Sequence, residues 1–535
     1  MRKSNLLSLG ADFWAWRAAS QPLSGDDIPR IVRPSGWVPE WSPEAVAARR
    51  RRLEEFEARW HELDHDMANA PLDEQVDHRL LGSALARVRW ELDVLKGWQR
   101  NPLFYVYQTL GAIFELLLPP PPFDQVRIRD LVRRAESIPS TLDAARVNLA
   151  NEAVRPFALL AIGALEDVSR RLQSVVEGLA PLVEAPDLEQ LSAAMRSAGP
   201  ALDAFADWLH GRLTSMQTAS AVGRAAYLHF LEKVALVSLS PEQILAGARQ
   251  ELERAIAFES IEQQRNRELP PLALPGSQAD QIERQAAGEA MLRAFCEEHD
   301  LLSFPDWLRR YRNLPLPAYL APLRGLGVTD DLTSADRLDQ DGISYILEPS
   351  ADLPYFYLAM ARDPRTLIAH EGVHYYQLAL AWAHPDPIRR HYYDSGPNEG
   401  IAFYTEEMLL QAGLFDDSPR SREIIYSFMR LRAVRVDIDV RLALGELSID
   451  SAAEELARRV PMDLATARQE AAMFASEPGQ AISYQVGKLQ IVQFLADARR
   501  AQGQRFSLRA FHDSLLVNGN VPIALQHWET LEPEG

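Results

Sequence analysis

Two histidines with a glutamate beside the first give the sequence its clearest chemical signal. The stretch LIAHEGVHYYQLAL, residues 367–380, places His370 and His374 four residues apart, with Glu371 directly after His370. In a helix this spacing puts both imidazoles on one face, about one turn apart. Neutral imidazoles that converge on one point are typical zinc ligands, and Glu371 would then accept a proton from an activated water. The alternative is a buried apolar helix whose histidines only satisfy hydrogen bonds.

A catalytic zinc site also needs a third protein ligand and an open coordination position. The best candidate is Glu399 in SGPNEGIAFYTEEMLLQAG, residues 395–413, where Pro397 is expected to open a second helix and Gly413 to close it. Two antiparallel helices joined by the intervening loop would bring Glu399 back to the histidine pair. Further along the same helix, Glu406 is expected to orient one histidine through its other ring nitrogen. We expect one Zn²⁺ ion, although these ligand types suit several divalent metals.

A third segment places polar groups on a helix that is otherwise apolar. In EPGQAISYQVGKLQIVQFLADARR, residues 477–500, Gln480, Tyr484 and Lys488 follow one another at four-residue intervals. Polar groups on a buried helix need partners or a cavity, and an active-site wall would supply one. Tyr484 would donate a hydrogen bond to a developing oxyanion, and Lys488 and Gln480 would hold the substrate. The alternative is a structural polar ladder, or a salt bridge from Lys488 to a carboxylate.

One further histidine is a weaker candidate. His512 lies in RAFHDSLLVNGNVP, close to the C-terminal end of the sequence. It could line the substrate cleft, or it could cap the neighbouring loop, which is the structural alternative.

The elements that must position these residues are mostly helices. Asp363 followed by Pro364 is typical of a helix start, and the spacing from there to about Ala383 predicts one regular helix that carries the histidine pair. Just upstream, GISYILEPSADLPYFYLAM, residues 342–360, predicts a short β-hairpin beside the metal site. An edge strand there could hold an extended peptide by main-chain pairing.

Two proline-rich segments interrupt the helical pattern. They are LLPPPPFD at 117–124 and RELPPLALPGSQ at 267–278, and successive prolines remove amide donors that a helix needs. We expect a mainly α protein in which a helical N-terminal half, 1–266, and a helical catalytic half, 267–535, form two lobes around a cleft or one continuous domain.

The composition and charge of the chain limit the classes of partner that we expect it to bind. The formal net charge of −19 over 535 residues argues against nucleic acid, because phosphate binding needs a concentrated basic face. A single cysteine excludes an intrachain disulfide and a thiolate metal cluster. We find no apolar run of about 18 residues and no unbroken apolar segment at the N-terminus, so we expect a cytoplasmic protein without a membrane partner. The sequence leaves the oligomeric state open.

Several segments together resemble a known bacterial family. AHEGVHYYQ, NEGIAFYTEEMLLQAGLFDD, PGQAISYQVGKLQI and FSLRAFHDSLLVNGNVP, in that order, are similar to the family called domain of unknown function 885, as are ADFWAWRAASQP and SPEAVAARRRRLEEF near the N-terminus. That family resembles the helical gluzincin peptidases, which include the thimet oligopeptidase and angiotensin-converting-enzyme groups. Family members usually carry a longer histidine segment with a Pro-Gly insertion, whereas this chain has the compact form that ends in VHYYQ.

The resemblance implies a function as well as a fold. It implies an almost wholly helical enzyme with a cleft, zinc held by His370, His374 and Glu399, and Glu371 as the general base. Short peptides that fit the cleft would be the substrates. We therefore expect a zinc-dependent hydrolase of the gluzincin type, a metallopeptidase that cleaves peptides or peptide-like amides. The alternatives are a metal-dependent enzyme acting on a small amide, ester or amino-acid-derived metabolite, and a helical binding protein with a vestigial site.

Overall fold

The structure, a computed structural model, describes residues 2–24, 31–67 and 69–531. It is 70% helical and contains one small three-stranded sheet, which confirms the mainly α prediction. No helix in these ranges is both long enough and apolar enough to cross a membrane.

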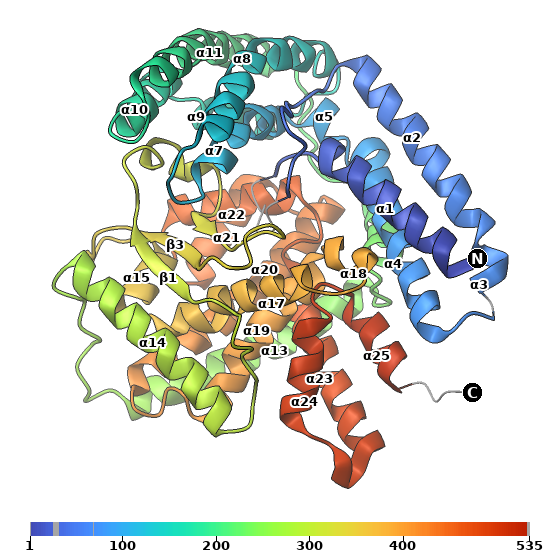
Figure 1. Ribbon diagram of the computed structural model, residues 1–535. Helices are drawn as coiled ribbons and strands as arrows, with labels where there is room; N and C mark the ends of the chain where they lie inside the picture. Colours follow the sequence, from blue (N-terminus) through green and yellow to red (C-terminus); the bar gives the residue numbers. More distant parts are fainter. Residues whose placement is uncertain (1, 25–30, 68, 532–535) are drawn as a thin grey trace.

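The N-terminal helices wrap one side of the molecule (Figure 1). Ser42 caps the long arginine-rich helix α2, and its side chain accepts a hydrogen bond from the Ala45 amide. The first helices are α1 (Arg2–Ser20), α2 (Pro43–Glu62), α3 (Asp64–Met67), α4 (Leu72–Arg89), the π-helix η1 (Trp90–Leu95), α5 (Gly97–Arg100), α6 (Pro102–Val106), the π-helix η2 (Tyr107–Gly111) and α7 (Ala112–Leu117).

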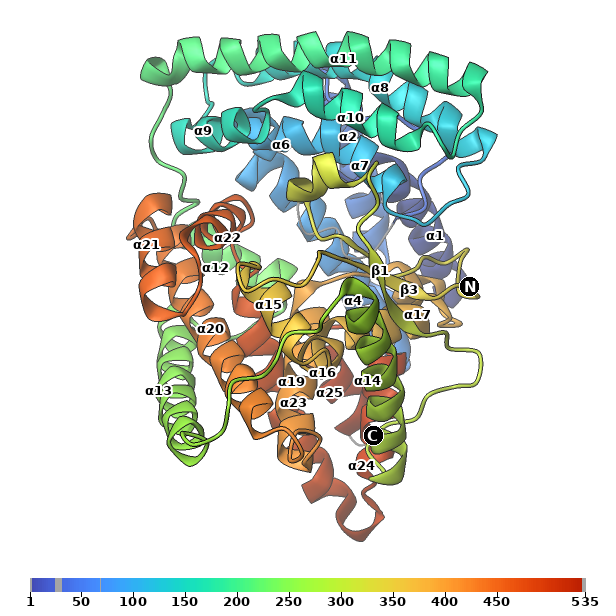
Figure 2. The same ribbon diagram turned by 90° about the vertical axis from the view of Figure 1, so that its left-hand side faces the viewer.

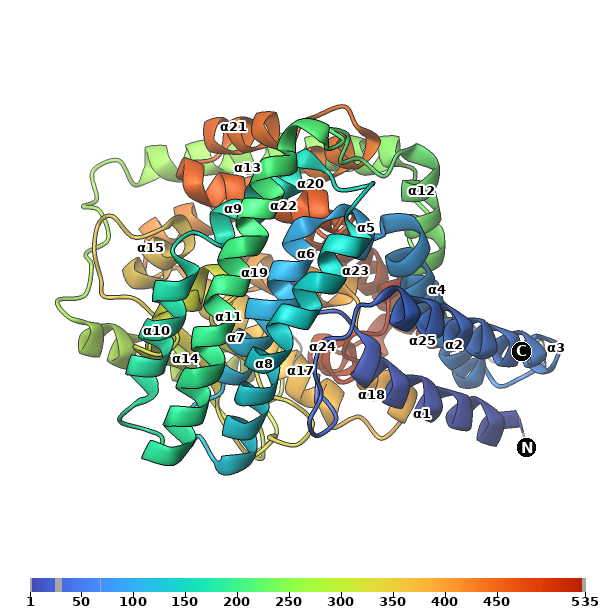
Figure 3. The same ribbon diagram turned by 90° about the horizontal axis from the view of Figure 1, so that it is seen from above.

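A layer of long helices covers the top of the molecule in Figure 2, and Figure 3 shows three of them, α8, α10 and α11, running side by side. The four prolines separate this layer from α7, as predicted, and Asp124 then caps α8. The helices of this part are α8 (Gln125–Asn148), α9 (Arg155–Ala164), α10 (Val168–Leu179), α11 (Ala185–Arg212), η3 (Leu213–Ser215), α12 (Arg224–His229) and the π-helix η4 (Phe230–Val234).

Helices α13 (Pro241–Arg265) and α14 (Gln278–Glu298) lie on either side of the second proline-rich segment, so that break is also confirmed. α13 packs along α20 (Pro419–Leu444), a helix from the other predicted half of the chain. The boundary between residues 266 and 267 stays a prediction.

The sheet is not the predicted hairpin. Its strands are β1 (Tyr311–Pro315), β2 (Asp330–Asp331) and β3 (Gly342–Ile346), in the order β1-β3-β2, and the 3₁₀-helix η5 (Ala321–Leu326) lies between β1 and β2. β3 pairs in parallel with β1, from Tyr311 opposite Gly342, and antiparallel with β2. The second run of the expected hairpin forms a helix, α15 (Tyr355–Arg362), which Pro354 precedes. That prediction was wrong, because the aromatic side chains of α15 pack on α20. The ring centroids of Tyr355 and Phe428 lie 5.8 Å apart.

The interior of the C-terminal part holds the segment with the histidine pair. Beneath the sheet lie α16 (Arg365–Leu367), the π-helix η6 (Ile368–Gly372) and α17 (Val373–Trp382), followed by α18 (Pro387–His391) and α19 (Ser395–Ala412). The last helices are α20, α21 (Ile449–Arg459), α22 (Leu464–Ser476), α23 (Ile482–Gln502), the 3₁₀-helix η7 (Gly503–Arg505), α24 (Leu508–Val517) and α25 (Ile523–Leu531). α19 packs along α23 and also contacts η6, so three elements surround the histidine pair.

Candidate metal centre

The three predicted ligands meet in the interior. His370 lies in η6, His374 in the first turn of α17 and Glu399 in the first two turns of α19. Oε2 of Glu399 lies 3.3 Å from Nε2 of His370 and 3.3 Å from Nε2 of His374. The two imidazole planes stand at 84°, and all three side chains are buried. Within the described ranges, no other group of three histidine, cysteine or acidic side chains gathers in this way.

These separations suit a metal ion better than hydrogen bonds. Metal bonds of about 2.0–2.1 Å at tetrahedral angles place ligand atoms about 3.3–3.4 Å apart. Nε2 of His374 and Oε2 of Glu399 form no hydrogen bond with any described residue, although both atoms are fully buried. A buried polar atom without a partner is costly, and a cation bound between these atoms would remove that cost. The residues present therefore fit a zinc ion held by His370, His374 and Glu399.

The histidine pair does not lie in the regular helix that the sequence predicted. Asp363 does begin this segment, since its carboxylate accepts a hydrogen bond from the Arg365 amide, but η6 inserts a π turn at Ile368–Gly372. π turns occur often at functional sites. Gly372 relieves crowding within this turn, because an added Cβ would lie 3.0 Å from Cγ2 of Ile368. Both histidines stay on one face in either geometry.

The second ligand helix is fixed at both ends and along its length. Asp394 caps α19, and its side chain accepts a hydrogen bond from the Gly396 amide; the helix therefore begins at Ser395, before the predicted Pro397. Gly413, in the left-handed region with φ +101°, ends it as predicted. Between these points the backbones of α19 and α23 are in direct contact at two glycines. A Cβ on Gly400 would lie 2.6 Å from Cα of Gly487, so no larger residue fits there. This close approach holds Glu399 opposite the start of α23.

Glu406 lies where the sequence placed it, on the far side of a histidine ring. Its Oε1 is 2.7 Å from Nδ1 of His370, so that Nδ1–H donates to the carboxylate and Nε2 faces the metal position. The sequence analysis missed Arg432 of α20, whose Nη2 donates to the same oxygen at 2.9 Å. Arg432 and Arg435 are buried in a helix rich in apolar residues, and buried arginines in such a pattern are the signal that could have revealed this contact.

The charges of the site are strongly coupled. Burial alone would lower the pKa of His370, but the carboxylates of Glu399 and Glu406 raise it to about 9. Burial would raise the pKa of Glu399, yet the two histidines outweigh it and lower that pKa. Both shifts favour a positive charge beside the Glu399 carboxylate, and ligands of this kind must be deprotonated to bind metal.

The two predicted catalytic residues, Glu371 and Tyr484, have different surroundings. Glu371 is half-buried and faces the sheet, where burial, Asp330 and then Glu371 all raise the pKa of Tyr311. Tyr484, in the first turn of α23, stacks on the ring of His370 with centroids 5.9 Å apart. The guanidinium of Arg435 lies 4.9 Å from the centroid of the tyrosine ring. The structure thus brings Tyr484 to the ligand cluster and places Glu371 next to a ligand in the chain, and the roles of both residues stay predictions.

Two of the predicted substrate-binding residues have other partners. Nζ of Lys488 lies 2.8 Å from Glu251 and 2.8 Å from Glu407, so the salt-bridge alternative describes it and no ammonium is left for a substrate carboxylate. Nε2 of His512 lies 2.8 Å from the Tyr404 hydroxyl and Nδ1 lies 2.7 Å from the Leu301 carbonyl, so its partners are remote in sequence and are not in the neighbouring loop that it was expected to cap.

The third predicted substrate-binding residue is Gln480. It is buried in the turn that precedes α23, and it lines a cavity.

Two solved structures share the fold of the whole chain. One, from Shewanella oneidensis, is described as a putative lipoprotein of unknown function; it has a TM-score of 0.74 and 16% sequence identity, and the alignment covers 99% of this chain and 100% of that chain. The other, from Colwellia psychrerythraea, is described as a putative lipoprotein; it has a TM-score of 0.72 and 16% identity, and the alignment covers 99% of this chain and 98% of that chain.

These structures correct the predicted location. A lipoprotein is anchored to a membrane through a lipid, whereas the sequence analysis expected a cytoplasmic protein. The cytoplasmic expectation is therefore contradicted by these neighbours, and its basis was weak because composition and the lack of an apolar run cannot exclude a lipid anchor.

The sequence comparisons identify the family. No curated protein matches the chain. The pattern of one family, described as bacterial protein of unknown function (DUF885), matches residues 29–526 and so covers both ligand helices. The chain therefore belongs to the DUF885 family of bacterial proteins.

Proposed function

We propose that this protein is a zinc-dependent hydrolase of the gluzincin type that cleaves peptides or peptide-like amides. One observation carries the proposal: the buried carboxylate oxygen of Glu399 lies 3.3 Å from Nε2 of each buried histidine, a separation that suits two ligands of one tetrahedral zinc ion. The resemblance of the family to the helical gluzincin peptidases supports the same reaction.

The chain's own residues supply the remaining chemistry. A zinc ion in such a site lowers the pKa of water and polarises carbonyl groups. Glu371, next to a ligand but not among the ligands, takes the proton of the attacking water and passes it to the leaving amine. Tyr484 stacks on His370 and donates its hydroxyl proton to the oxyanion that develops on the substrate. Glu406 keeps His370 in the tautomer whose Nε2 faces the cluster.

The test separates binding from turnover. Glu371→Gln removes the base without touching a proposed ligand, so the variant should keep its zinc and lose hydrolysis by about 100-fold or more. The matched control is Glu348→Gln, at an exposed glutamate of the same chain, and it should behave like the wild type. The assay uses a panel of short peptides together with small amides and esters. Hydrolysis of small amides alone would favour a metabolite enzyme, and unchanged activity of Glu371→Gln would contradict the proposed role of this residue.

A further inference from the structure

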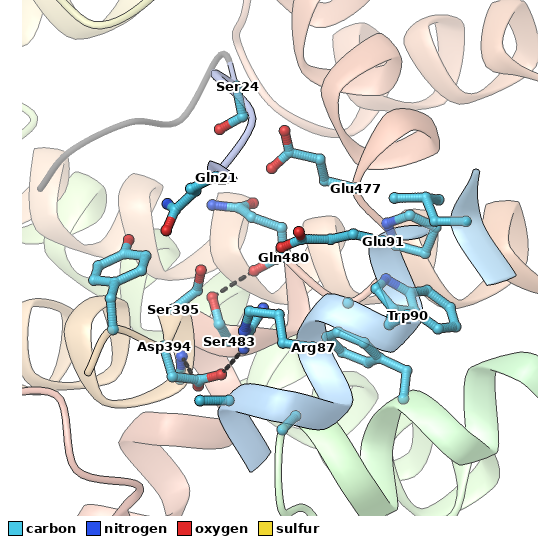
Figure 4. A pocket seen from close by; sticks show the side chains of 18 of the residues that line it. Gln21, Ser24, Arg87, Trp90, Glu91, Asp394, Ser395, Glu477, Gln480 and Ser483 are labelled. Carbon is cyan, nitrogen blue, oxygen red and sulfur yellow. Dashed lines mark hydrogen bonds and ion pairs between the residues drawn. The ribbon is translucent and has the colours of Figure 1, made fainter. Parts of the chain in front are cut away.

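A cavity of about 240 Å³ is formed by segments that are far apart in the sequence, and two of these segments also carry residues of the metal centre. Its walls come from α1, from α4 and η1, from the start of α19 and from the turn that opens α23. Figure 4 shows Glu91, Glu477, Gln480 and Gln21 around a common space, with Arg87 and Asp394 joined below it.

Two of the lining segments are shared with the metal centre. Pro397 lines the cavity, and Glu399 follows two residues later in the same helix. Ser483 and Gln480 line it from the other side, and Tyr484, the next residue after Ser483, stacks on the ring of His370. The helices that hold Glu399 and Tyr484 therefore also form part of the cavity wall.

The charges on the cavity wall oppose an anionic ligand. Arg17 pairs with Glu91 at 2.5 Å, and Arg87 pairs with Asp394, so both guanidiniums are already neutralised. Glu477 adds a carboxylate, and among the described lining residues the acidic side chains outnumber the arginines.

The two helix ends at the cavity are neutralised as well. Asp394 accepts a hydrogen bond from the Gly396 amide at the start of α19. The buried carboxylate of Asp439 accepts hydrogen bonds from the amides of Gly479 and Ile482 at the start of α23. The partial positive charge that a helix N-terminus offers to an anion is thus met by the protein itself at both ends.

Apolar and aromatic side chains form the rest of the wall. Pockets with such walls and a few polar groups bind apolar groups and orient them through the polar ones. The main contributors are Trp14, Leu23, Trp90, Phe104, Phe230 and Val486.

We propose that this cavity is the specificity subsite of the enzyme and takes a bulky, uncharged apolar side chain, aromatic or branched aliphatic, of a peptide-like substrate. The proposal rests on the proposed hydrolase function, because it assigns a substrate class to that same site. Gln480 and Ser483 form the polar edge that orients the bound residue, and acidic side chains are disfavoured because both lining arginines are already paired with carboxylates.

The test fills the cavity without touching the ligands. Ala235 lines it at a half-exposed position, and Gln490 lines it from α23; Ala235→Trp and Gln490→Trp each place an indole in the space. Ala206→Trp, at a half-exposed position of α11 away from the cavity, is the matched control. Thermal melts establish that each variant is folded, and zinc analysis establishes that the metal centre is intact.

The substrates are peptides that vary at one position next to the scissile bond, with Phe, Leu, Ala, Lys or Glu there. The wild type should prefer Phe and Leu, and each filling variant should lower kcat/KM for these two by about tenfold or more while it changes the Ala peptide by less than about twofold. Equal losses for all peptides, no loss for any, or a wild-type preference for Glu or Lys would overturn the proposal.

Binding measured without turnover separates this proposal from the hydrolase proposal. Calorimetry with zinc-loaded Glu371→Gln should show the Phe peptide binding about tenfold more tightly than the Glu peptide, and Ala235→Trp in the same background should abolish that difference. If wild-type protein hydrolyses nothing while this binding pattern holds, the reaction fails and the subsite stands. If hydrolysis occurs but binding does not depend on residue 235, the subsite fails and the reaction stands.

Discussion

Oε1 of Glu406 lies 2.7 Å from Nδ1 of His370, on the side of the imidazole ring opposite to Glu399. A carboxylate in this position fixes the histidine tautomer and makes its other nitrogen a better metal ligand. Helix α19 therefore contacts the histidine segment at two points, because it supplies both Glu406 and the third ligand, Glu399.

Glu406→Gln should weaken zinc binding without abolishing it. The amide can still meet the ring, but it loses the negative charge that favours a metal on His370, so zinc affinity should fall by about 10–100-fold. Competition with a chromophoric chelator measures this directly. Glu407→Gln, at the neighbouring glutamate that pairs with Lys488, is the control. Equal zinc affinities for wild type and Glu406→Gln would show that the contact is structural only.

Arg432→Met should destabilise the protein through the charge that it leaves behind. Arg432 is buried and donates to Glu406 at 2.9 Å, so its removal leaves a buried carboxylate with one partner fewer. Breaking a buried pair from one side costs about 3–5 kcal/mol, and we expect a lower melting temperature and weaker zinc binding. The double variant Arg432→Met/Glu406→Gln should recover part of the melting temperature. Additive losses would exclude coupling between the two residues.

Lys488→Met tests whether this residue serves the fold or the substrate. Its ammonium lies between Glu251 and Glu407, which join α13 to α19 and α23, so the variant should melt at a lower temperature. KM for peptides with a free C-terminal carboxylate should change no more than KM for the same peptides as C-terminal amides. A selective rise in KM for the free carboxylates would restore the substrate-binding role.

How far the sequence predicts the site depends on the range of each interaction. Spacing within one helix identified His370 and His374, and cap signals located the helix that carries Glu399, because these are local features. Arg432 was missed since its contact joins residues 26 apart in the chain, on a different helix. The partners of Lys488 lie even further away, with Glu251 separated from it by 237 positions.

The errors in the predicted fold have a similar origin. A π turn leaves the two histidines on one face, so their spacing alone cannot distinguish it from a regular helix. The aromatic run at 355–360 has strand-like composition, but the hydroxyls of Tyr355 and Ser427 meet at 2.7 Å and the segment packs on α20 as a helix. Tertiary packing outweighed local preference there.

Stability should depend on pH through Asp439. Burial raises the pKa of this carboxyl from 3.8 to about 7, although it accepts hydrogen bonds from backbone amides. Between these values the native state keeps a proton that the unfolded chain has released, so its contribution to stability is full below pH 4 and is lost as pH rises to about 7. Asp439→Asn keeps an acceptor for the amides and removes the titration.

The wild type should therefore lose roughly 2–3 kcal/mol relative to Asp439→Asn between pH 5 and pH 8. Melting temperatures of both proteins across this range measure the difference, in which the titration of other groups cancels. Parallel curves for the two proteins would show that Asp439 has an ordinary pKa in the native state.

The metal content of the purified protein tests the account most directly. Elemental analysis after removal of loosely bound ions should find one zinc per chain in the wild type and in Glu371→Gln, and much less than one in His374→Ala and Glu399→Ala. A wild type that binds no divalent metal at stoichiometric level, or that binds it equally well without His374 and Glu399, would contradict the metal centre and the reaction built on it.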